Sequence, residues 1–185
     1  MDKRALRSEL RARRRERDAG ELDAWGRLLA AHAASVPGDT LTAFVGVDGE
    51  VPTLPLIDAL AAAGRRVLLP ITLDDMSLDW AEYAGSDSLA PAGFGLLEPT
   101  GARLGPEAIA EAETILAPAL AIDRMGNRLG QGGGCYDRSL PMATGEVIAV
   151  VADDEVVDAV PTEPHDRPVD AVLTPSAGLL RFPRG

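Results

Sequence analysis

The sequence predicts an α/β protein in which helices cover both faces of a mostly parallel β-sheet. The chain has 185 residues, 46% of them hydrophobic, which suits one hydrophobic core in a single domain over residues 1–185. Short, continuously apolar segments recur along the chain, as is typical of strands buried on both faces. Helical patterns separate these segments, and this alternation is typical of a parallel sheet.

Two helices are expected before the first strand. Residues 3–17 consist largely of good helix formers, with Leu6 and Leu10 one turn apart and Asp2 in the N-cap position. Residues 21–34 repeat the helical period, and a Pro-Gly-Asp sequence ends that helix. The first helix carries eight of the 18 basic residues of the chain.

Strands and helices then alternate. Residues 41–47 form the first expected strand, and a helix follows from Thr53, its N-cap, to Gly64. Residues 66–70 form the next buried strand. The remaining elements are a strand over 78–83, loops over 85–105, a short helix over 106–112, and strands over 114–120, 146–151 and 170–174.

Charge is unevenly distributed over a chain whose net charge is −11. Residues 1–17 contain eight of the 18 basic residues but only three of the 29 acidic ones. Because the rest of the chain is strongly acidic, it would repel phosphate backbones, so we expect no nucleic-acid partner. The basic segment could receive one anionic small molecule. Its alternative use as a nucleic-acid arm would appear as a steep salt dependence of binding.

Composition also limits the location and assembly of the protein. No apolar stretch approaches the roughly 20 residues that cross a bilayer, and no apolar region follows the basic start as in a secretory signal. The single cysteine, Cys135, excludes an internal disulfide framework. We therefore expect a soluble cytoplasmic protein without a membrane partner. We expect a monomer, with a dimer as the alternative.

The strongest chemical motif is the glycine-rich segment within residues 123–138. Four of the five residues 130–134 are glycine, so the backbone can approach a ligand and turn its N–H groups toward anionic oxygens. Residues 135–138 are expected to open a short helix, and Asp137 could hold Mg²⁺. The segment matches neither a Walker A loop nor the Gly-x-Gly-x-x-Gly pattern. Glycine content alone leaves a phosphate-binding loop and a mobile surface loop equally open.

Two further segments contain charged candidates. Lys3 and Arg7 lie four residues apart on one helix face and could clamp phosphates, although such helices are usually only solvated. The loop over residues 161–170 carries Glu, His and Asp before a strand and could ligate a metal or phosphate. Its alternative is a turn in which these side chains bond the backbone.

The binding of a flat heterocycle has candidates as well. Glu50 follows the first expected strand and could accept hydrogen bonds from the N–H groups of a ring, or it could belong to a polar turn. Met76, Trp80 and Phe94 could form an apolar wall for such a ring. The same residues would equally serve as packing residues.

In their order and spacing these segments resemble the 5-formyltetrahydrofolate cyclo-ligase family (methenyltetrahydrofolate synthetases) over nearly the whole chain. The resemblance depends mainly on the long glycine motif. The matching segments are Lys3-Arg4-Ala5-Leu6-Arg7, Glu50 with Thr53, residues 64–70 with Met76, residues 94–99, residues 127–138, and His165-Asp166 before Val169-Asp170.

The resemblance implies a fold and a reaction. The family's fold is a Rossmann-like three-layer α/β sandwich with a mostly parallel sheet, related to phosphosugar isomerases and CoA transferases. Its enzymes convert 5-formyltetrahydrofolate and ATP, with Mg²⁺, into 5,10-methenyltetrahydrofolate, ADP and phosphate. Phosphorylation of the formyl oxygen allows N10 of the folate to attack the formyl carbon. Positioning and charge neutralisation suffice, so no protein nucleophile is expected.

The resemblance also implies site residues. The implied Mg²⁺ ligands, directly or through water, are Asp137 and Asp166. The implied folate-binding residues are Glu50, Met76, Phe94, Gly132, Gly133, Gly134 and Tyr136. The implied ATP-binding residues are Lys3, Arg4, Arg7, Arg128, Leu129, Gly130, Gln131, Gly132, Gly133, Gly134, Cys135 and Tyr136.

Two positions depart from the family pattern. The family commonly has paired aromatic residues before the motif's Asp, whereas Cys135 precedes a single Tyr136 here. Gln131 stands where an aromatic or basic residue is frequent. The change at Cys135 bears on how the folate is contacted, and the change at Gln131 bears on the contact that this position usually makes. Neither removes a charge that the phosphoryl step needs.

Two other classes of function remain open at the level of the residues. One is an α/β isomerase or transferase acting on a phosphorylated small molecule, which would have no use for Mg²⁺ and ATP. The other is a nucleotide- or folate-binding module without turnover. Release of ADP in the presence of 5-formyltetrahydrofolate separates the cyclo-ligase from both.

Overall fold

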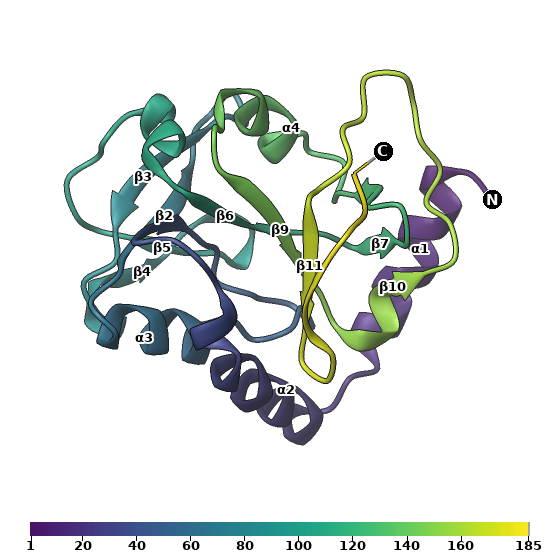
Figure 1. Cartoon of the computed structure of the whole chain (residues 1–185), viewed down its shortest axis with the longest axis horizontal. Coiled ribbons are helices and arrows are strands. Elements are labelled where there is room, and N and C mark those ends of the chain that lie inside the picture. The colour runs from purple at the N-terminus through teal and green to yellow at the C-terminus, as the bar shows by residue number, and fades with distance from the viewer. Residues whose placement is uncertain (185) are drawn as a thin grey trace.

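A seven-stranded sheet forms the centre of the protein in the computed structural model, which describes residues 1–184. The five central strands are parallel, and one antiparallel strand closes each edge. From edge to edge the order is β12 (Gly178–Arg181), β11 (Ala171–Thr174), β9 (Glu146–Val150), β6 (Thr114–Pro118), β1 (Thr40–Thr42), β2 (Arg66–Thr72) and β3 (Leu78–Glu82) (Figure 1).

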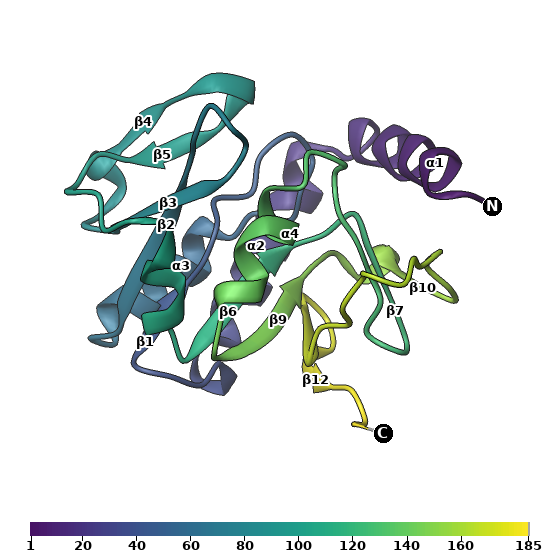
Figure 2. The ribbon, with the colours of Figure 1, turned by 90° about the horizontal axis from the view of Figure 1, so that it is seen from above.

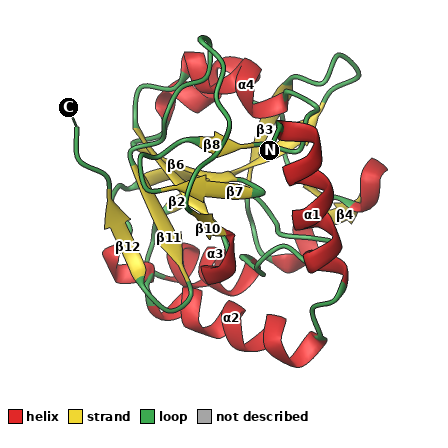
Figure 3. Ribbon diagram, turned by 90° about the vertical axis from the view of Figure 1, so that its right-hand side faces the viewer, coloured by secondary structure: helices red, strands yellow, loops and turns green. Residues whose placement is uncertain are grey.

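Helices cover both faces of this sheet, as predicted. The helices α2 (Ala19–Ala31) and α3 (Leu54–Ala62) pack on one face, while α4 (Cys135–Ser139) and the 3₁₀-helix η4 (Pro106–Glu111) pack on the other (Figure 3). Successive strand residues serve opposite faces because side chains alternate along a strand. One apolar cluster therefore includes Leu69 and Leu116 of the sheet, and the other includes Leu68 and Ile115.

A smaller sheet and the first helix lie beside the central sheet. The strands β7 (Ala121–Asp123) and β8 (Arg128–Leu129) form a hairpin, and β10 (Val156–Val157) pairs in parallel with β7. The helix α1 (Lys3–Arg15) packs against this sheet through Leu10, which is buried with Leu120 and Leu129. Figure 2 shows α1, β7 and β10 at one end of the molecule, with β4 and β5 at the other.

The remaining elements are short. A two-stranded antiparallel pair, β4 (Leu89–Pro91) and β5 (Leu97–Pro99), lies within the segment that was predicted to be loops only. The other 3₁₀-helices are η1 (Ala33–Ser35), η2 (Ser86–Ser88), η3 (Gly93–Gly95), η5 (Leu140–Met142) and η6 (Asp153–Glu155). Within residues 1–184, no helix has both the length and the apolar character needed to cross a membrane.

The predicted helix caps are partly confirmed. The Asp2 carboxylate accepts a hydrogen bond from the backbone N–H of Ala5, at 2.8 Å, as an N-cap should. Gly64 follows the end of α3 with a φ of 85°, as expected for a glycine there. Thr53 is the N-cap of α3, but its hydroxyl donates to the carbonyl of Phe44 and accepts from the N–H of Gly46. Its side chain therefore stabilises the preceding loop rather than the helix.

Two predictions about the strands need correction. The first strand was predicted over residues 41–47, but only Thr40–Thr42 are strand, and the chain then turns away to form the loop that Thr53 holds. The glycine run was predicted to follow directly on the strand at 114–120. That strand ends at Pro118, and the β7–β8 hairpin lies between it and the glycines. Asp123 organises the hairpin turn by accepting from the N–H groups of Met125 and Asn127.

Candidate functional site

A cavity of about 550 Å³ lies at the carboxyl ends of the central strands. Its walls include residues that follow β1, the end of β2, and the segment after β6. From β1 the sheet continues to β2 on one side and to β6 on the other, so the connectivity reverses between β1 and β6. Ligands in open α/β sheets bind at such a switch point. The position of the cavity therefore favours it as a ligand site.

The predicted glycine run forms one wall of this cavity. Gly132 and Gly134 have φ angles of 103° and 77°, a backbone region that favours glycine. A Cβ on Gly133 would stand 3.0 Å from the terminal carbon of Met76, which packs over the loop. Within residues 1–184, no protein acceptor is bonded to the backbone N–H groups of residues 131–134. These donors are therefore available to an anionic oxygen.

The helix α1 holds the glycine run from outside through its basic side chains. Arg7 Nε donates to the carbonyl of Gly130 at 2.9 Å. Arg11 donates to both the backbone and side-chain oxygens of Gln131. Each of these bonds uses an oxygen of the loop and leaves its N–H groups free. The structure thus connects the basic helix with the glycine run, although the two are more than 100 residues apart in sequence.

A buried arginine continues this basic face into the cavity wall. The Arg14 side chain is only 5% exposed, with Nε 2.6 Å from Glu155 Oε2 and Nη2 2.6 Å from the carbonyl of Ala119. Its Nη1 atom lies 3.8 Å from Glu50 Oε2 and has no hydrogen-bond partner. Burial raises the pKa of Glu50, while a hydrogen bond from the N–H of Val47 and the charge of Arg14 oppose that rise.

Sequence reasoning did not single out Arg11, Arg14 or Arg15, all of which line the cavity. The pattern that could have found two of them is helical: Arg11 lies four residues after Arg7, and Arg14 three residues after Arg11. Arg4, which was predicted to contact ATP, is exposed and does not line the cavity.

The carboxylate of Asp137 stands at the edge of the cavity beside another buried arginine. Arg128 Nη2 donates to Asp137 Oδ1 at 3.0 Å, and Arg128 Nη1 donates to the carbonyl of Pro118 at 3.0 Å. Burial lowers the pKa of Arg128, and the nearby charge of Asp137 works against that change. The Asp137 side chain is 69% exposed, so its second oxygen is accessible. An accessible carboxylate beside the guanidinium of Arg128 suits Mg²⁺, which prefers oxygen ligands.

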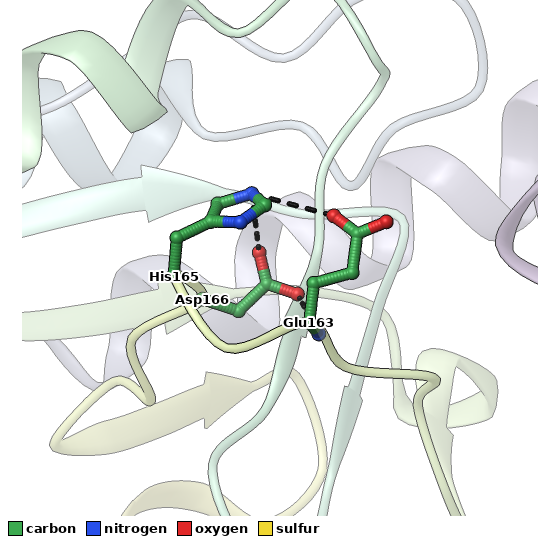
Figure 4. Close-up of side chains that lie close together, drawn as sticks. All are labelled: Glu163, His165 and Asp166. Atoms are coloured by element: carbon green, nitrogen blue, oxygen red, sulfur yellow. Dashed lines mark hydrogen bonds and ion pairs between the residues drawn. The ribbon is translucent and has the colours of Figure 1, made fainter.

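Asp166 belongs to a separate cluster with Glu163 and His165 (Figure 4). His165 Nε2 lies 3.3 Å from Glu163 Oε2 and 3.6 Å from Asp166 Oδ1. Lys3 Nζ donates to Asp166 Oδ2 at 2.7 Å. Burial alone would raise the pKa of Asp166, but the hydrogen bonds from Lys3 and from the N–H of Glu163 outweigh it and lower the pKa.

The structure does not bring Asp166 to the cavity wall beside Asp137. Neither Asp166 nor Lys3 lines the cavity, and the two are bound to each other. The charge of Asp166 nevertheless helps to keep Arg128 protonated, as Asp137 does, so Arg128 lies within the field of both carboxylates. Both predicted metal ligands therefore act on the charge of Arg128, but only Asp137 is bonded to it.

The predicted apolar residues divide between the cavity and the core. Met76 and Phe94 line the cavity, and Phe94 is 80% exposed. Tyr136 also lines it, but the ring is mostly buried and meets Trp80 edge to face, with ring centroids 6.4 Å apart. Trp80 is wholly buried and does not line the cavity, so the packing alternative is right for that residue.

Leu129, predicted to contact ATP, is another core residue. Its side chain is buried with Leu10 and Leu120 between α1 and the smaller sheet, because it points away from the glycines that follow it. Cys135, in contrast, is half-buried in the cavity wall, and burial raises the pKa of its thiol.

Comparisons with known proteins agree with this geometry. The model of the 5-formyltetrahydrofolate cyclo-ligase family matches residues 1–175. A 5-formyltetrahydrofolate cyclo-ligase of Mycolicibacterium smegmatis is 43% identical over 173 residues, which are 90% of this chain and 86% of that protein. The Escherichia coli (strain K12) cyclo-ligase is 30% identical over 90% of this chain and 97% of its own length.

Solved structures show the same fold. The Aquifex aeolicus 5,10-methenyltetrahydrofolate synthetase superimposes with a TM-score of 0.83 and 26% identity, over 100% of this chain and 95% of that one. A Mycoplasma pneumoniae 5,10-methenyltetrahydrofolate synthetase gives a TM-score of 0.73 at 19% identity, over 93% of this chain and 98% of that one. At that identity the second likeness concerns the fold alone.

Proposed function

Because the chain belongs to the 5-formyltetrahydrofolate cyclo-ligase family, we propose that the cavity at the switch point is its active site and that ATP is its co-substrate. The chain is an enzyme that converts 5-formyltetrahydrofolate into 5,10-methenyltetrahydrofolate. In the proposed reaction ADP and phosphate are released. The observation that carries the assignment is the set of free backbone N–H groups at residues 131–134 in the wall of a cavity that also contains Glu50.

The chemistry explains why ATP is needed. The formyl group on N5 is an amide, so its carbon is a weak electrophile and its oxygen a poor leaving group. Transfer of the γ-phosphoryl group of ATP to that oxygen releases ADP and leaves an iminium-like carbon. N10 then attacks this carbon, the carbon–oxygen bond breaks, and phosphate departs while N10 loses its proton. Such a sequence needs alignment and charge neutralisation rather than a protein nucleophile.

On this proposal the nucleotide lies along the glycine run. The N–H groups of residues 131–134 would receive phosphate oxygens, and Arg128 would supply a buried positive charge beside them. Arg7 and Arg11 would act mainly by fixing the glycine run, because Arg7 is already bonded to the carbonyl of Gly130 and Arg11 to the oxygens of Gln131. The basic helix at residues 1–17 thus contributes to the ATP site of a single cyclo-ligase domain.

The residues present also suit Mg²⁺. Asp137 offers an accessible carboxylate oxygen in the cavity wall. Asp166, which lies outside that wall and is bonded to Lys3, would act through a bridging water. Bound together with ATP, Mg²⁺ would supply neutralisation of the phosphate charge. In that state Arg128 and Lys3, freed from their carboxylates, could bond phosphate oxygens instead.

Glu50 is the proposed anchor for the pterin. Glu50 lines the same cavity as the glycine run, and Val47 N–H donates to its Oε1 at 3.1 Å. A carboxylate can accept two parallel N–H bonds from the amino-pyrimidine edge of a pterin. Met76 and Phe94 provide apolar surface for the ring system.

Absorbance-monitored conversion of 5-formyltetrahydrofolate tests the proposal. We expect methenyl-folate to form only when both ATP and Mg²⁺ are present, with one ADP released per ring closed. Product without ATP would refute the co-substrate assignment. Binding of ATP without turnover would indicate a non-catalytic relative. The variant Glu50→Gln should bind the folate more weakly and bind ATP as the wild type does. A cytoplasmic location and a monomeric state stay predictions.

A further inference from the structure

Arg14 is a buried arginine to which the proposed chemistry gives no task. Two of its nitrogens are fixed at the carboxyl edge of the sheet, by Glu155 on η6 and by the carbonyl of Ala119 after β6. The third, Nη1, is buried, has no hydrogen-bond partner among residues 1–184, and lies 3.8 Å from Glu50 Oε2. Arg14 therefore extends from the β6 side of the switch point to the loop after β1 that carries Glu50.

The partners of Glu155 explain why Arg14 can also interact with Glu50. Glu155, which is 1% exposed, also pairs with Arg17 Nη1 at 3.3 Å and accepts from the N–H of Ala152. Its charge is thus satisfied without Arg14. The two buried arginine side chains share Glu155, and each also reaches one further carboxylate, Glu50 from Arg14 and Asp154 from Arg17.

Among the described residues, Arg14 is the cation with the largest effect on Glu50. Arg14 faces it from α1, and the negative groups near it are Glu155 on η6 and Asp48 on its own loop. Tyr136 on α4, whose phenol is also influenced by the charge of Glu50, is neutral because burial raises its pKa. Burial and the two nearby negative charges therefore favour the neutral form of the Glu50 carboxyl. Arg14 and the N–H of Val47 favour its ionised form.

We propose that Arg14 is a positioning residue that keeps the Glu50 carboxylate ionised and oriented for the N–H groups of the pterin. The inference rests on the proposed function, because it takes Glu50 as the pterin anchor. A neutral carboxyl would lose part of its acceptor capacity and present an O–H to a donor edge. Arg14 would thereby control folate affinity without touching the folate.

Three variants separate this role from a structural one. Arg14→Met removes the charge and leaves Glu155 paired with Arg17, whereas Arg14→Lys keeps the charge. Arg17→Met is the matched control: Arg17 follows the end of α1, and its side chain is also buried and also pairs with Glu155, but it forms no ion pair with Glu50. All three are expected to weaken the docking of α1, and only Arg14→Met should alter the titration of Glu50.

The first readout needs no ligand. Carbon-13 NMR of the labelled glutamate carboxyls, with Glu50 assigned by Glu50→Gln, follows its titration in the free protein. We expect the Glu50 midpoint to move to higher pH in Arg14→Met and to stay near that of the wild type in Arg14→Lys and Arg17→Met. An unchanged midpoint in Arg14→Met overturns the proposal, as does an equal shift in Arg17→Met.

The second readout is calorimetric binding of 5-formyltetrahydrofolate without ATP, from about pH 5 to about pH 8, a range that includes that of a buried carboxyl. Affinity should fall as pH falls through the Glu50 midpoint. Arg14→Met should therefore lose affinity at a higher pH than the wild type, by about tenfold or more at the acid end, and Arg14→Lys should restore it. If the wild type fails to bind, the proposed function fails. If it binds and Arg14→Met shows the same pH profile, only the role of Arg14 is refuted.

Discussion

Replacing Gly132 by alanine tests whether the glycine run binds phosphate through its backbone. Gly132 has a φ of 103°, which an L-residue adopts only at a cost of about 1–3 kcal/mol. The new Cβ would meet nothing closer than the guanidinium carbon of Arg7, at 3.6 Å, which is an ordinary contact. The effect is therefore one of backbone conformation. An exposed loop can relieve it by rotating residue 132, which turns the adjacent N–H groups away from the ligand.

Binding of ATP must then restore the strained conformation. If the whole cost falls on binding, affinity for a non-hydrolysable ATP analogue with Mg²⁺ drops by about 5-fold to about 150-fold. If part of the conformational cost already destabilises the free protein, urea unfolding measures that part as a lower free energy of unfolding. The measurement is calorimetric titration of the analogue, together with urea unfolding of the same samples.

Gly85 supplies the matched control for this substitution. Its φ is 102°, a Cβ there would meet no atom within 4 Å, and it does not line the cavity. Gly85→Ala should therefore show the same backbone cost in unfolding and no loss of nucleotide affinity. If Gly132→Ala binds the analogue as tightly as Gly85→Ala does, the glycine run does not hold phosphate through its backbone.

Three further variants test other parts of the structure. Asp137→Asn should raise the Mg²⁺ concentration needed for half-maximal turnover at least about tenfold with an unchanged circular dichroism spectrum, and an unchanged requirement would exclude Asp137 as a ligand. Arg7→Met should weaken ATP-analogue binding because the glycine run loses a donor, while the exposed control Arg4→Met should not; equal losses would point to net charge alone. Burial, and then the hydrogen bond to Asp58, raise the pKa of Tyr83 from 10.0 to about 12. Between pH 10 and about 12 the folded protein therefore retains a proton that the unfolded chain loses. The contribution of Tyr83 to the free energy of unfolding is complete below pH 10 and is lost as pH rises to about 12. Urea unfolding should show a shallower alkaline loss of stability in Tyr83→Phe, and identical slopes would contradict the assignment.

Local chemistry made part of this fold predictable from sequence. The cap at Asp2 and the glycine at the end of α3 depend on residues a few positions apart, and both are found as expected. The alternation of buried strands and helices along the chain was sufficient to predict the three-layer architecture. The strand at 41–47 was predicted too long because its apolar run continues after the hydrogen-bonded ladder has ended, and the hydroxyl of Thr53 then determines the path of the loop.

The site was predictable where one segment contains both the ligand-binding groups and their support. The glycine run is such a segment, and the structure places it in the cavity wall. Arg14 is different, because its importance comes from Glu155 and Glu50, 141 and 36 positions away in the chain. A basic helix looks alike in sequence whether its arginines are solvated or buried. Only the fold distinguishes Arg14 from an exposed neighbour such as Arg13.

Backbone strain gives an independent argument that this cavity is functional. Among the residues that the structure describes, three that are not glycine have positive φ angles: Asp48 at 53°, Met76 at 68° and Phe94 at 60°. They belong to three different segments, and all three line the cavity. Each costs roughly 1–3 kcal/mol and persists only where the surrounding structure enforces it. Met76 and Phe94 were expected here from sequence, whereas Asp48 was not. A Cβ added at Gly95, the residue after Phe94, would lie 3.5 Å from Asp48 Oδ2, so the Glu50 loop and the apolar wall approach each other at these strained residues.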